Sequence, residues 1–156
     1  MSVFKIGQCD SVAEIGKLLH WVIDDPTIST YDKSTGLRTA EKRIQRLIEQ
    51  GKPVNEKDSQ GHTILDWLLV TKTWSTEIEE FIQHLVLDLG IDINQRDRRN
   101  FTPLMWAVIF DRAHVVPLLL SLGADPNLEQ SEGKNCFYFA EECDNLASLS
   151  ALKDLS

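Results

Sequence analysis

The sequence predicts an all-α protein built from repeated pairs of helices, and three observations lead to this prediction. Turn and cap residues return along the chain at regular intervals. Between these landmarks, apolar residues follow helical spacing. The chain has 156 residues, of which 42% are hydrophobic, so it is long and apolar enough to bury a continuous core.

The most complete repeat covers residues 97–129. It contains a Thr-Pro-Leu step at Thr102, which predicts the start of a short helix because proline fits the first helical turn. A second apolar stretch, 115–122, is followed by Gly123, a residue type that can take the left-handed conformation at a helix end. This segment is therefore one helix pair with its own start and stop signals.

Copies of the same landmarks lie on both sides of this repeat. One common interval separates three pairs: Thr102 and Asn135, Gly90 and Gly123, and Asn94 and Asn127. A second common interval, longer than the first, separates three upstream pairs: Thr63 and Thr102, Gly51 and Gly90, and Asn55 and Asn94. The upstream repeat, about residues 58–96, thus carries six extra residues, which we place at 71–76 between its two helices.

These landmarks resemble the ankyrin-repeat family, whose unit is a β-turn finger followed by two antiparallel helices, with a period of about 33 residues. The resemblance implies an all-α ankyrin solenoid of about four stacked units, with a degenerate first and last unit. We expect residues 39–156 to form the ankyrin-repeat domain, with partial repeats at 39–57 and 130–156. Residues 1–38 are expected to form an N-terminal helix and a loop that cap the stack.

The N-terminal elements follow from local signals. Residues 11–23 have apolar side chains at helical spacing, with Ser11 as a candidate N-cap and Glu14 in the capping-box position. Residues 25–36 are rich in turn-forming types and predict a mobile loop, and residues 39–50 predict a second helix that ends at Gly51. We expect Trp21, Trp67 and Trp106 to pack in the core.

Composition narrows the classes of partner. The net charge of −8 argues against a general nucleic-acid binder, since such proteins display a basic face. No segment approaches the roughly 18 apolar residues of a membrane span, and the N-terminus does not resemble a signal peptide. The three cysteines lack paired metal-ligand spacing. We therefore expect a cytoplasmic protein, monomeric by itself, with no metal, cofactor, membrane or nucleic-acid partner.

The resemblance implies that the chain binds another protein through the concave surface of fingers and inner helices. The candidate residues at these positions, with the tryptophan of the insertion, are Gln60, His62, Arg98, Arg99, Phe101, Phe110 and Trp74. Arginine and aromatic side chains dominate binding hot spots, so an exposed Phe101 flanked by Arg98 and Arg99 is the strongest signal. The alternative is that Phe101 folds back on its neighbour. Trp74 either packs on the following helix or forms a second contact surface.

The role within this class stays open among an adaptor, an inhibitor such as an antidote to a toxin, and a bacterial effector. A competing hypothesis is a hydrolase-like enzyme that uses His62 and Asp66, which lie four residues apart near a helix start. A loop histidine beside a helix-capping carboxylate is the simpler interpretation, because geometry must precede any claim of acid–base chemistry. We therefore predict that the chain is not an enzyme.

Overall fold

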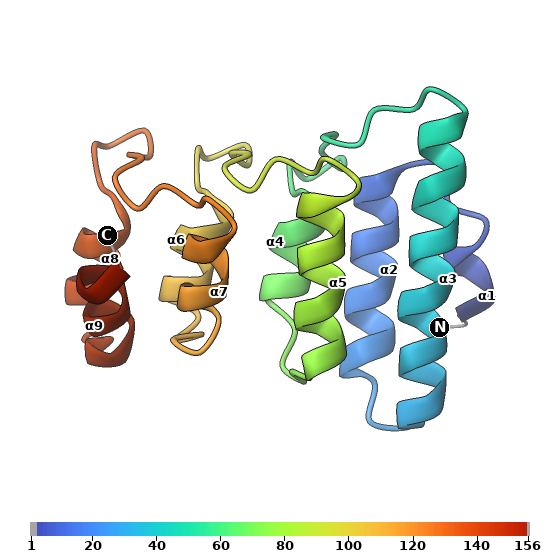
Figure 1. Cartoon of the computed structure of the whole chain (residues 1–156), viewed down its shortest axis with the longest axis horizontal. Helices are drawn as coiled ribbons and strands as arrows, with labels where there is room; N and C mark the ends of the chain where they lie inside the picture. Colours follow the sequence, from blue (N-terminus) through green and yellow to red (C-terminus); the bar gives the residue numbers. More distant parts are fainter. Residues whose placement is uncertain (1–2, 156) are drawn as a thin grey trace. The chain divides into compact units, whose positions relative to one another are not determined.

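The computed structural model describes residues 3–155, which form helices joined by turns, with no β-strand among them (Figure 1). This confirms the all-α prediction. The chain divides into two compact units, residues 1–91 and residues 92–156, and each unit is described by itself. The predicted division at residue 38 stays a prediction.

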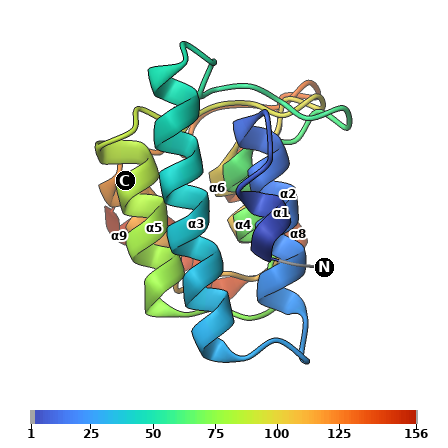
Figure 2. The ribbon, with the colours of Figure 1, turned by 90° about the vertical axis from the view of Figure 1, so that its right-hand side faces the viewer.

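The described part of the first unit holds five helices: α1 (Val3–Ile6), α2 (Val12–Asp24), α3 (Thr30–Glu49), α4 (Ile64–Leu69) and α5 (Thr76–Leu87). Helix α3 lies beside both α2 and α5, while α2 also packs against α4 (Figures 1 and 2). The approach of α2 to α4 depends on Gly16, since a Cβ there would lie 2.8 Å from the Cα of Ile64. The predicted N-cap is confirmed, because the Ser11 side chain accepts a hydrogen bond from the backbone N–H of Glu14.

The prediction of a loop over residues 25–36 is wrong beyond residue 29, because α3 begins at Thr30. Ser29 caps this helix by accepting a hydrogen bond from the N–H of Asp32 at 3.1 Å. The hydroxyl of Thr35 then bonds back to the carbonyl of Tyr31 at 2.9 Å, inside the helix. Gly36 is buried in α3 near a methyl of Val22, so its lack of a side chain serves packing rather than a turn.

The described part of the second unit holds two helix pairs, α6 (Pro103–Ile109) with α7 (Val116–Ser121) and α8 (Cys136–Glu142) with α9 (Leu146–Leu155). Thr102 caps α6 through the N–H of Met105, and Pro103 occupies the first turn as predicted. Asn135 takes the place of the cap threonine in the last repeat and accepts from the N–H of Tyr138 at 3.2 Å. The final, degenerate repeat therefore still forms a helix pair.

Two asparagines bridge consecutive loops, one in each unit. In the first unit, the side-chain amide of Asn55 donates to the carbonyl of Gly90 at 3.2 Å. In the second, Asn94 donates to the carbonyl of Gly123 at 3.0 Å and accepts from the N–H of Asp125 at 2.9 Å. The repeated asparagine found in the sequence thus ties each loop to the next one within its unit.

Apolar side chains of the helix pairs α4–α5 and α6–α7 pack in the core of their units. The fully buried members are Leu65, Leu68, Ile82, Leu85, Leu104, Ala107, Val115, Val116 and Leu119, whereas Val86 and Leu118 are half-buried. Among the tryptophans, Trp106 is buried and Trp67 is half-buried. The prediction for Trp21 is wrong, because its side chain is 52% exposed. The buried stripe of α2 passes through Leu19, Val22 and Ile23, and Trp21 points away from it.

Candidate protein-interaction surface

The finger of the central repeat, residues 97–101, is organised by one buried carboxylate. Oδ1 of Asp97 accepts hydrogen bonds from the backbone N–H groups of Arg99 at 2.8 Å and Phe101 at 2.9 Å. Its Oδ2 accepts from the indole Nε1 of Trp106 at 3.2 Å, which ties the finger to α6. The N–H of Asp97 also donates to the carbonyl of Phe101 and closes the turn. Such a turn, in which an aspartate bonds backbone groups ahead of it, fixes where Arg99 and Phe101 point.

The first unit repeats this arrangement in its finger, residues 58–62. Asp58 accepts from the N–H groups of Gln60 at 2.8 Å and His62 at 2.9 Å, and from Nε1 of Trp67 at 2.9 Å. Burial of Asp58 raises the pKa of its carboxyl, but the bonds from His62, Trp67 and Gln60 outweigh this and hold the pKa below its usual value. In the last finger Gln130 stands in the aspartate's place and accepts from the N–H of Glu132.

These aspartates were missed by sequence reasoning, although the signal was present. The interval between Asp58 and Asp97 is the same as the interval between Trp67 and Trp106. Each aspartate therefore precedes its tryptophan by the same number of positions. A carboxylate and an indole donor that recur together at one spacing predict a side-chain hydrogen bond repeated in each unit.

An aromatic strip runs over the finger side of the second unit, defined by Phe110, Trp106, Phe101, Phe139 and Tyr138. The Phe101 ring stacks on Trp106 with 5.1 Å between centroids, and Trp106 stacks on Phe110 at 5.6 Å. Phe101 also meets Phe139 at 5.3 Å, and Tyr138 contacts Phe139 edge to face. These spacings are within the range in which aromatic pairs attract one another.

The strip combines buried and exposed rings. Phe110 and Tyr138 are 45% and 38% exposed, whereas Phe101 is half-buried. The expectation of an exposed Phe101 is therefore wrong, because its ring folds back on Trp106. Phe110 closes one end of the strip and Tyr138 the other, so these two rings offer the accessible apolar surface.

Two cations lie on the strip. The guanidinium carbon of Arg99 is 5.1 Å from the centroid of Trp106 and 5.5 Å from that of Phe101. Nζ of Lys134 is 4.9 Å from the ring of Tyr138 and pairs with Glu132 at 2.8 Å. Stacking on an aromatic face leaves the edge of a guanidinium, with its N–H donors, free to meet another group. Arg98 and Arg99 are both exposed.

The first unit has a smaller counterpart around Trp67. Its ring contacts His62 at 5.2 Å and His20 at 5.5 Å, and Nζ of Lys17 lies 5.9 Å from its centroid. Burial lowers the pKa of His20, against the opposing effect of Asp24. Gln60 is exposed at the tip of the finger and His62 is half-buried. The histidine thus occupies the place that Phe101 takes in the second unit.

The remaining candidates lie elsewhere in the first unit. Trp74 is half-buried between α4 and α5, and its Nε1 donates to Glu79 of α5 at 2.9 Å, so the indole is held against the following helix. Asp66 is only 2% exposed and forms a capping box with Thr63, in which each side chain accepts from the other's backbone N–H. Its carboxylate therefore serves helix α4, as the simpler interpretation expected.

Two further observations concern residues 3–155. No three His, Cys, Asp or Glu side chains in this range are grouped so that they could hold a metal ion. No helix within the same range is both long and apolar enough to cross a membrane.

Comparison with known proteins identifies the repeats. A family model described as ankyrin repeats, three copies, matches residues 38–130. The chain is 31% identical over 97 residues to palmitoyltransferase Hip14 of Drosophila melanogaster, covering 62% of this chain and 14% of that protein. It is 32% identical over 125 residues to human palmitoyltransferase ZDHHC17, covering 78% of this chain and 18% of the relative.

A third relative is palmitoyltransferase AKR1 of Saccharomyces cerevisiae, 32% identical over 93 residues, which cover 60% of this chain and 11% of that protein. The chain thus spans less than a fifth of the length of these relatives, and the matches fall in their ankyrin region. Ankyrin repeats are protein-interaction modules with no catalysis of their own. With the family match covering more than half of its length, the chain belongs to the ankyrin-repeat family.

Proposed function

We propose that this chain binds a partner protein through its fingers and the first helix of each repeat, which are α4, α6 and α8. The aromatic strip of the second unit is the main contact. The observation that supports this most is the stacking of Arg99 on Trp106 and Phe101 beside the exposed ring of Phe110. Tryptophan, aromatic rings and arginine are the residue types that carry most binding energy in protein interfaces. In the first unit, we propose Gln60 and His62 as a separate, secondary contact.

The chemistry of this surface favours a partner that presents a carboxylate next to an apolar or aromatic side chain. The guanidinium of Arg99 is held in place by the rings beneath it, so little side-chain entropy is lost when its edge meets a carboxylate. The neighbouring Arg98 adds positive charge to the same finger. Phe110 then supplies an apolar anchor beside the charged contact. We leave Trp74 out of the surface, since its indole is held against α5.

The enzyme alternative receives less support. A carboxylate that caps α4 is fixed by backbone groups, and His62 is packed on Trp67. The transferase activity named in the relatives is not proposed for this chain, because the matched region covers so little of those proteins. We propose a cytoplasmic location, supported by the free thiols Cys9, Cys136 and Cys143.

The test compares partner capture by the wild type with capture by a double variant, Arg99→Glu with Phe110→Ala. Phe101 is left intact because it packs on Trp106. A control variant with a similar change of charge and size, Lys153→Glu with Leu146→Ala, alters exposed residues of α9 in the same unit. Proteins cross-linked in native lysate are identified by mass spectrometry, and their affinities are then measured by calorimetry with purified components.

We expect a partner that the wild type and the control retain and that the double variant binds at least about 30-fold more weakly, as for a hot spot of about 2 kcal/mol. Equal loss in both variants would indicate damage to the fold, which circular dichroism checks. Equal binding by all three proteins would contradict the proposed surface. If the partner has an activity, its inhibition on binding would distinguish an inhibitor from an adaptor or an effector.

A further inference from the structure

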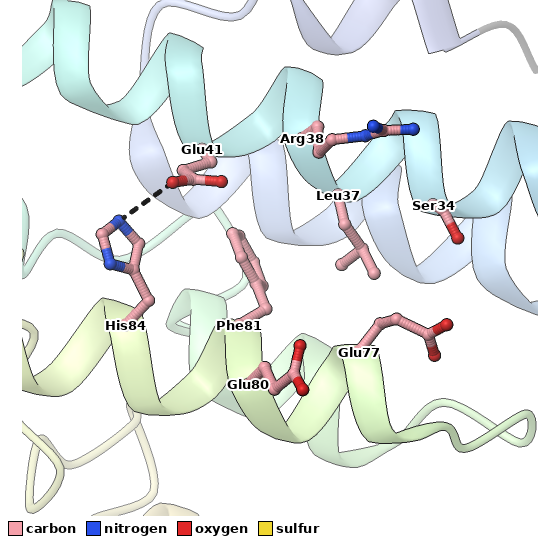
Figure 3. Close-up of a pocket in the computed structure, with 8 residues that line it drawn as sticks. All are labelled: Ser34, Leu37, Arg38, Glu41, Glu77, Glu80, Phe81 and His84. Atoms are coloured by element: carbon pink, nitrogen blue, oxygen red, sulfur yellow. Dashed lines mark ion pairs between the residues drawn. The ribbon is translucent and has the colours of Figure 1, made fainter.

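A groove with a volume of about 520 Å³ lies between α3 and α5 in the first unit (Figure 3). Each helix contributes four side chains at positions i, i+3, i+4 and i+7, which form one stripe along a helix. The stripe of α3 consists of Ser34, Leu37, Arg38 and Glu41, and that of α5 of Glu77, Glu80, Phe81 and His84. Facing stripes of packed helices are usually apolar, and here six of the eight side chains are polar.

The floor of the groove is apolar, and its walls carry three carboxylates beside one arginine, one histidine and one serine. Leu37 and Phe81 are 7% and 5% exposed, and they point between the two helices in Figure 3. On the α3 wall, Glu41 pairs with Nε2 of His84 at 3.4 Å. On the α5 wall stand the carboxylates of Glu77 and Glu80.

Glu77 and Glu80 are exposed and, within residues 3–155, no ion pair joins either of them to a cation. A hydrogen bond from the Ser75 side chain lowers the pKa of Glu77, so this carboxylate is charged at neutral pH. Arg38 is the arginine of the lining, and its side chain extends along α3 rather than across the groove to α5 (Figure 3). The α5 wall therefore presents two negative charges above an apolar floor.

The groove continues along α3 in both directions. Toward the start of the helix, a hollow lined by Lys33, Ser34 and Leu37 also reaches Glu77 and Ile78. Toward its end, a second hollow shares Glu41 and His84 with the groove and is lined by cations as well, Lys42 and Arg46. An extended segment of chain, not only a compact small molecule, thus has room along this face. The volume is within the range of about 300–1,000 Å³ typical of ligand sites.

We propose that this groove binds a peptide segment of a partner protein in which a lysine or arginine stands next to an apolar side chain. The apolar side chain would lie on Leu37 and Phe81, and the cation would meet Glu77 and Glu80. In the central part of the groove, charge complementarity favours a single cation over an anion, because the carboxylates of Glu77 and Glu80 would repel the latter. The hollows at either end carry Lys33, Lys42 and Arg46, so the positive charge of the segment is expected at its centre. This site lies on helices that contribute nothing to the aromatic strip, so it does not depend on the proposed function.

The test is a titration of the isotopically labelled full chain, followed by nuclear magnetic resonance of its backbone amides. The probe is the peptide acetyl-Leu-Arg-Leu-amide, and acetyl-Leu-Glu-Leu-amide is the probe of reversed charge. We expect saturable shifts with the arginine peptide at residues 34–41 and 77–84, and none of that kind with the glutamate peptide. Raising the salt concentration should weaken the binding, since the carboxylates are exposed.

Matched variants test the role of the two carboxylates. Glu77→Gln with Glu80→Gln should weaken the arginine peptide about tenfold, which corresponds to about 1.4 kcal/mol. Glu141→Gln with Glu142→Gln makes the same change of charge on exposed residues of α8 and should leave the affinity unchanged. Absence of saturable shifts, equal affinity for both peptides, or equal effects of the two double variants would each overturn the proposal. None of these outcomes bears on the proposed function, which is tested separately by partner capture at the aromatic strip.

Discussion

Replacement of Asp97 by alanine tests whether one carboxylate holds the central finger. Its side chain is 2% exposed and accepts three hydrogen bonds. Loss of the acceptor strands the indole N–H of Trp106, whose side chain is 9% exposed, at a cost of about 1–3 kcal/mol. Loss of the bond from the N–H of half-buried Phe101 adds about 1 kcal/mol to this cost. Loss of the bond from the N–H of exposed Arg99 adds less, because water can replace the carboxylate.

The free energy of unfolding should therefore fall by about 2–4 kcal/mol, a large share of the 5–15 kcal/mol typical of a domain. Urea unfolding followed by circular dichroism measures this loss, and hydrogen exchange at the amides of residues 99 and 101 locates it. Asp97→Asn keeps one acceptor oxygen for the backbone but turns an NH₂ group toward the indole, so its effect should be smaller than that of alanine.

The control is Asp125→Ala, which removes an exposed carboxylate that accepts from the N–H of Asn127 at 2.9 Å. Water replaces that partner, so the loss should be below about 1 kcal/mol. The reasoning is refuted if Asp97→Ala also costs less than about 1 kcal/mol, or if amide exchange at 99 and 101 does not quicken. Either result would mean that the finger is held by contacts of the rings and not by the carboxylate.

Three further predictions concern the core, a close helix contact and the thiols. Leu104→Ala, at a position 1% exposed, should cost about 2–5 kcal/mol of unfolding free energy, whereas Arg99→Ala should cost less than about 1 kcal/mol. If both variants lost similar unfolding free energy in urea, the assignment of Leu104 to the core and Arg99 to the surface would be wrong. Gly16→Ala should cost about 1–3 kcal/mol, since its Cβ would meet backbone of α4, and Gly36→Ala less, since a side-chain methyl can yield. If Gly16→Ala lowered the melting temperature less than Gly36→Ala, the close packing of α2 on α4 at Gly16 would be contradicted. At pH 8, iodoacetamide should modify exposed Cys143 well before the chain unfolds, and mass spectrometry should find no early label on the two thiols whose pKa burial raises to about 11 and about 12, Cys9 and Cys136.

Prediction from sequence succeeded where a residue type has one dominant structural use. Pro103 after Thr102 located the start of α6, and Ser11 with Glu14 located that of α2. It failed for residues 30–36, because serine, threonine and aspartate occur both in loops and on the exposed faces of helices. This segment is helical because Thr35 bonds to the carbonyl of Tyr31 and because α3 packs on its neighbours. The packing depends on tertiary structure, which the local sequence does not show.

The candidate site was harder to predict because it depends on which rings meet. Arg98, Arg99 and Phe101 were identified from residue type, but the stacking of Phe101 on Trp106 brings in α6, and its contact with Phe139 brings in α8. The contact of Phe101 with Phe139 joins two repeats, and neither residue type nor spacing predicts it. The exposure of Trp21 is also hard to predict. Helix α2 has apolar residues at more positions than one buried face can hold, so some of them must face solvent.

The asparagine bridges have a consequence for where this chain can change in length. The bond from Asn55 to Gly90 spans a repeat with six extra residues, and the bond from Asn94 to Gly123 spans a repeat without them, yet both bonds form. The spacing of the loops is thus independent of the length of the helical hairpin between them. Evolution or an engineer can therefore lengthen a repeat at the turn between its helices while the bridged loops keep their register. The turn between α6 and α7 is accordingly a natural place to insert a reporter or a new binding loop.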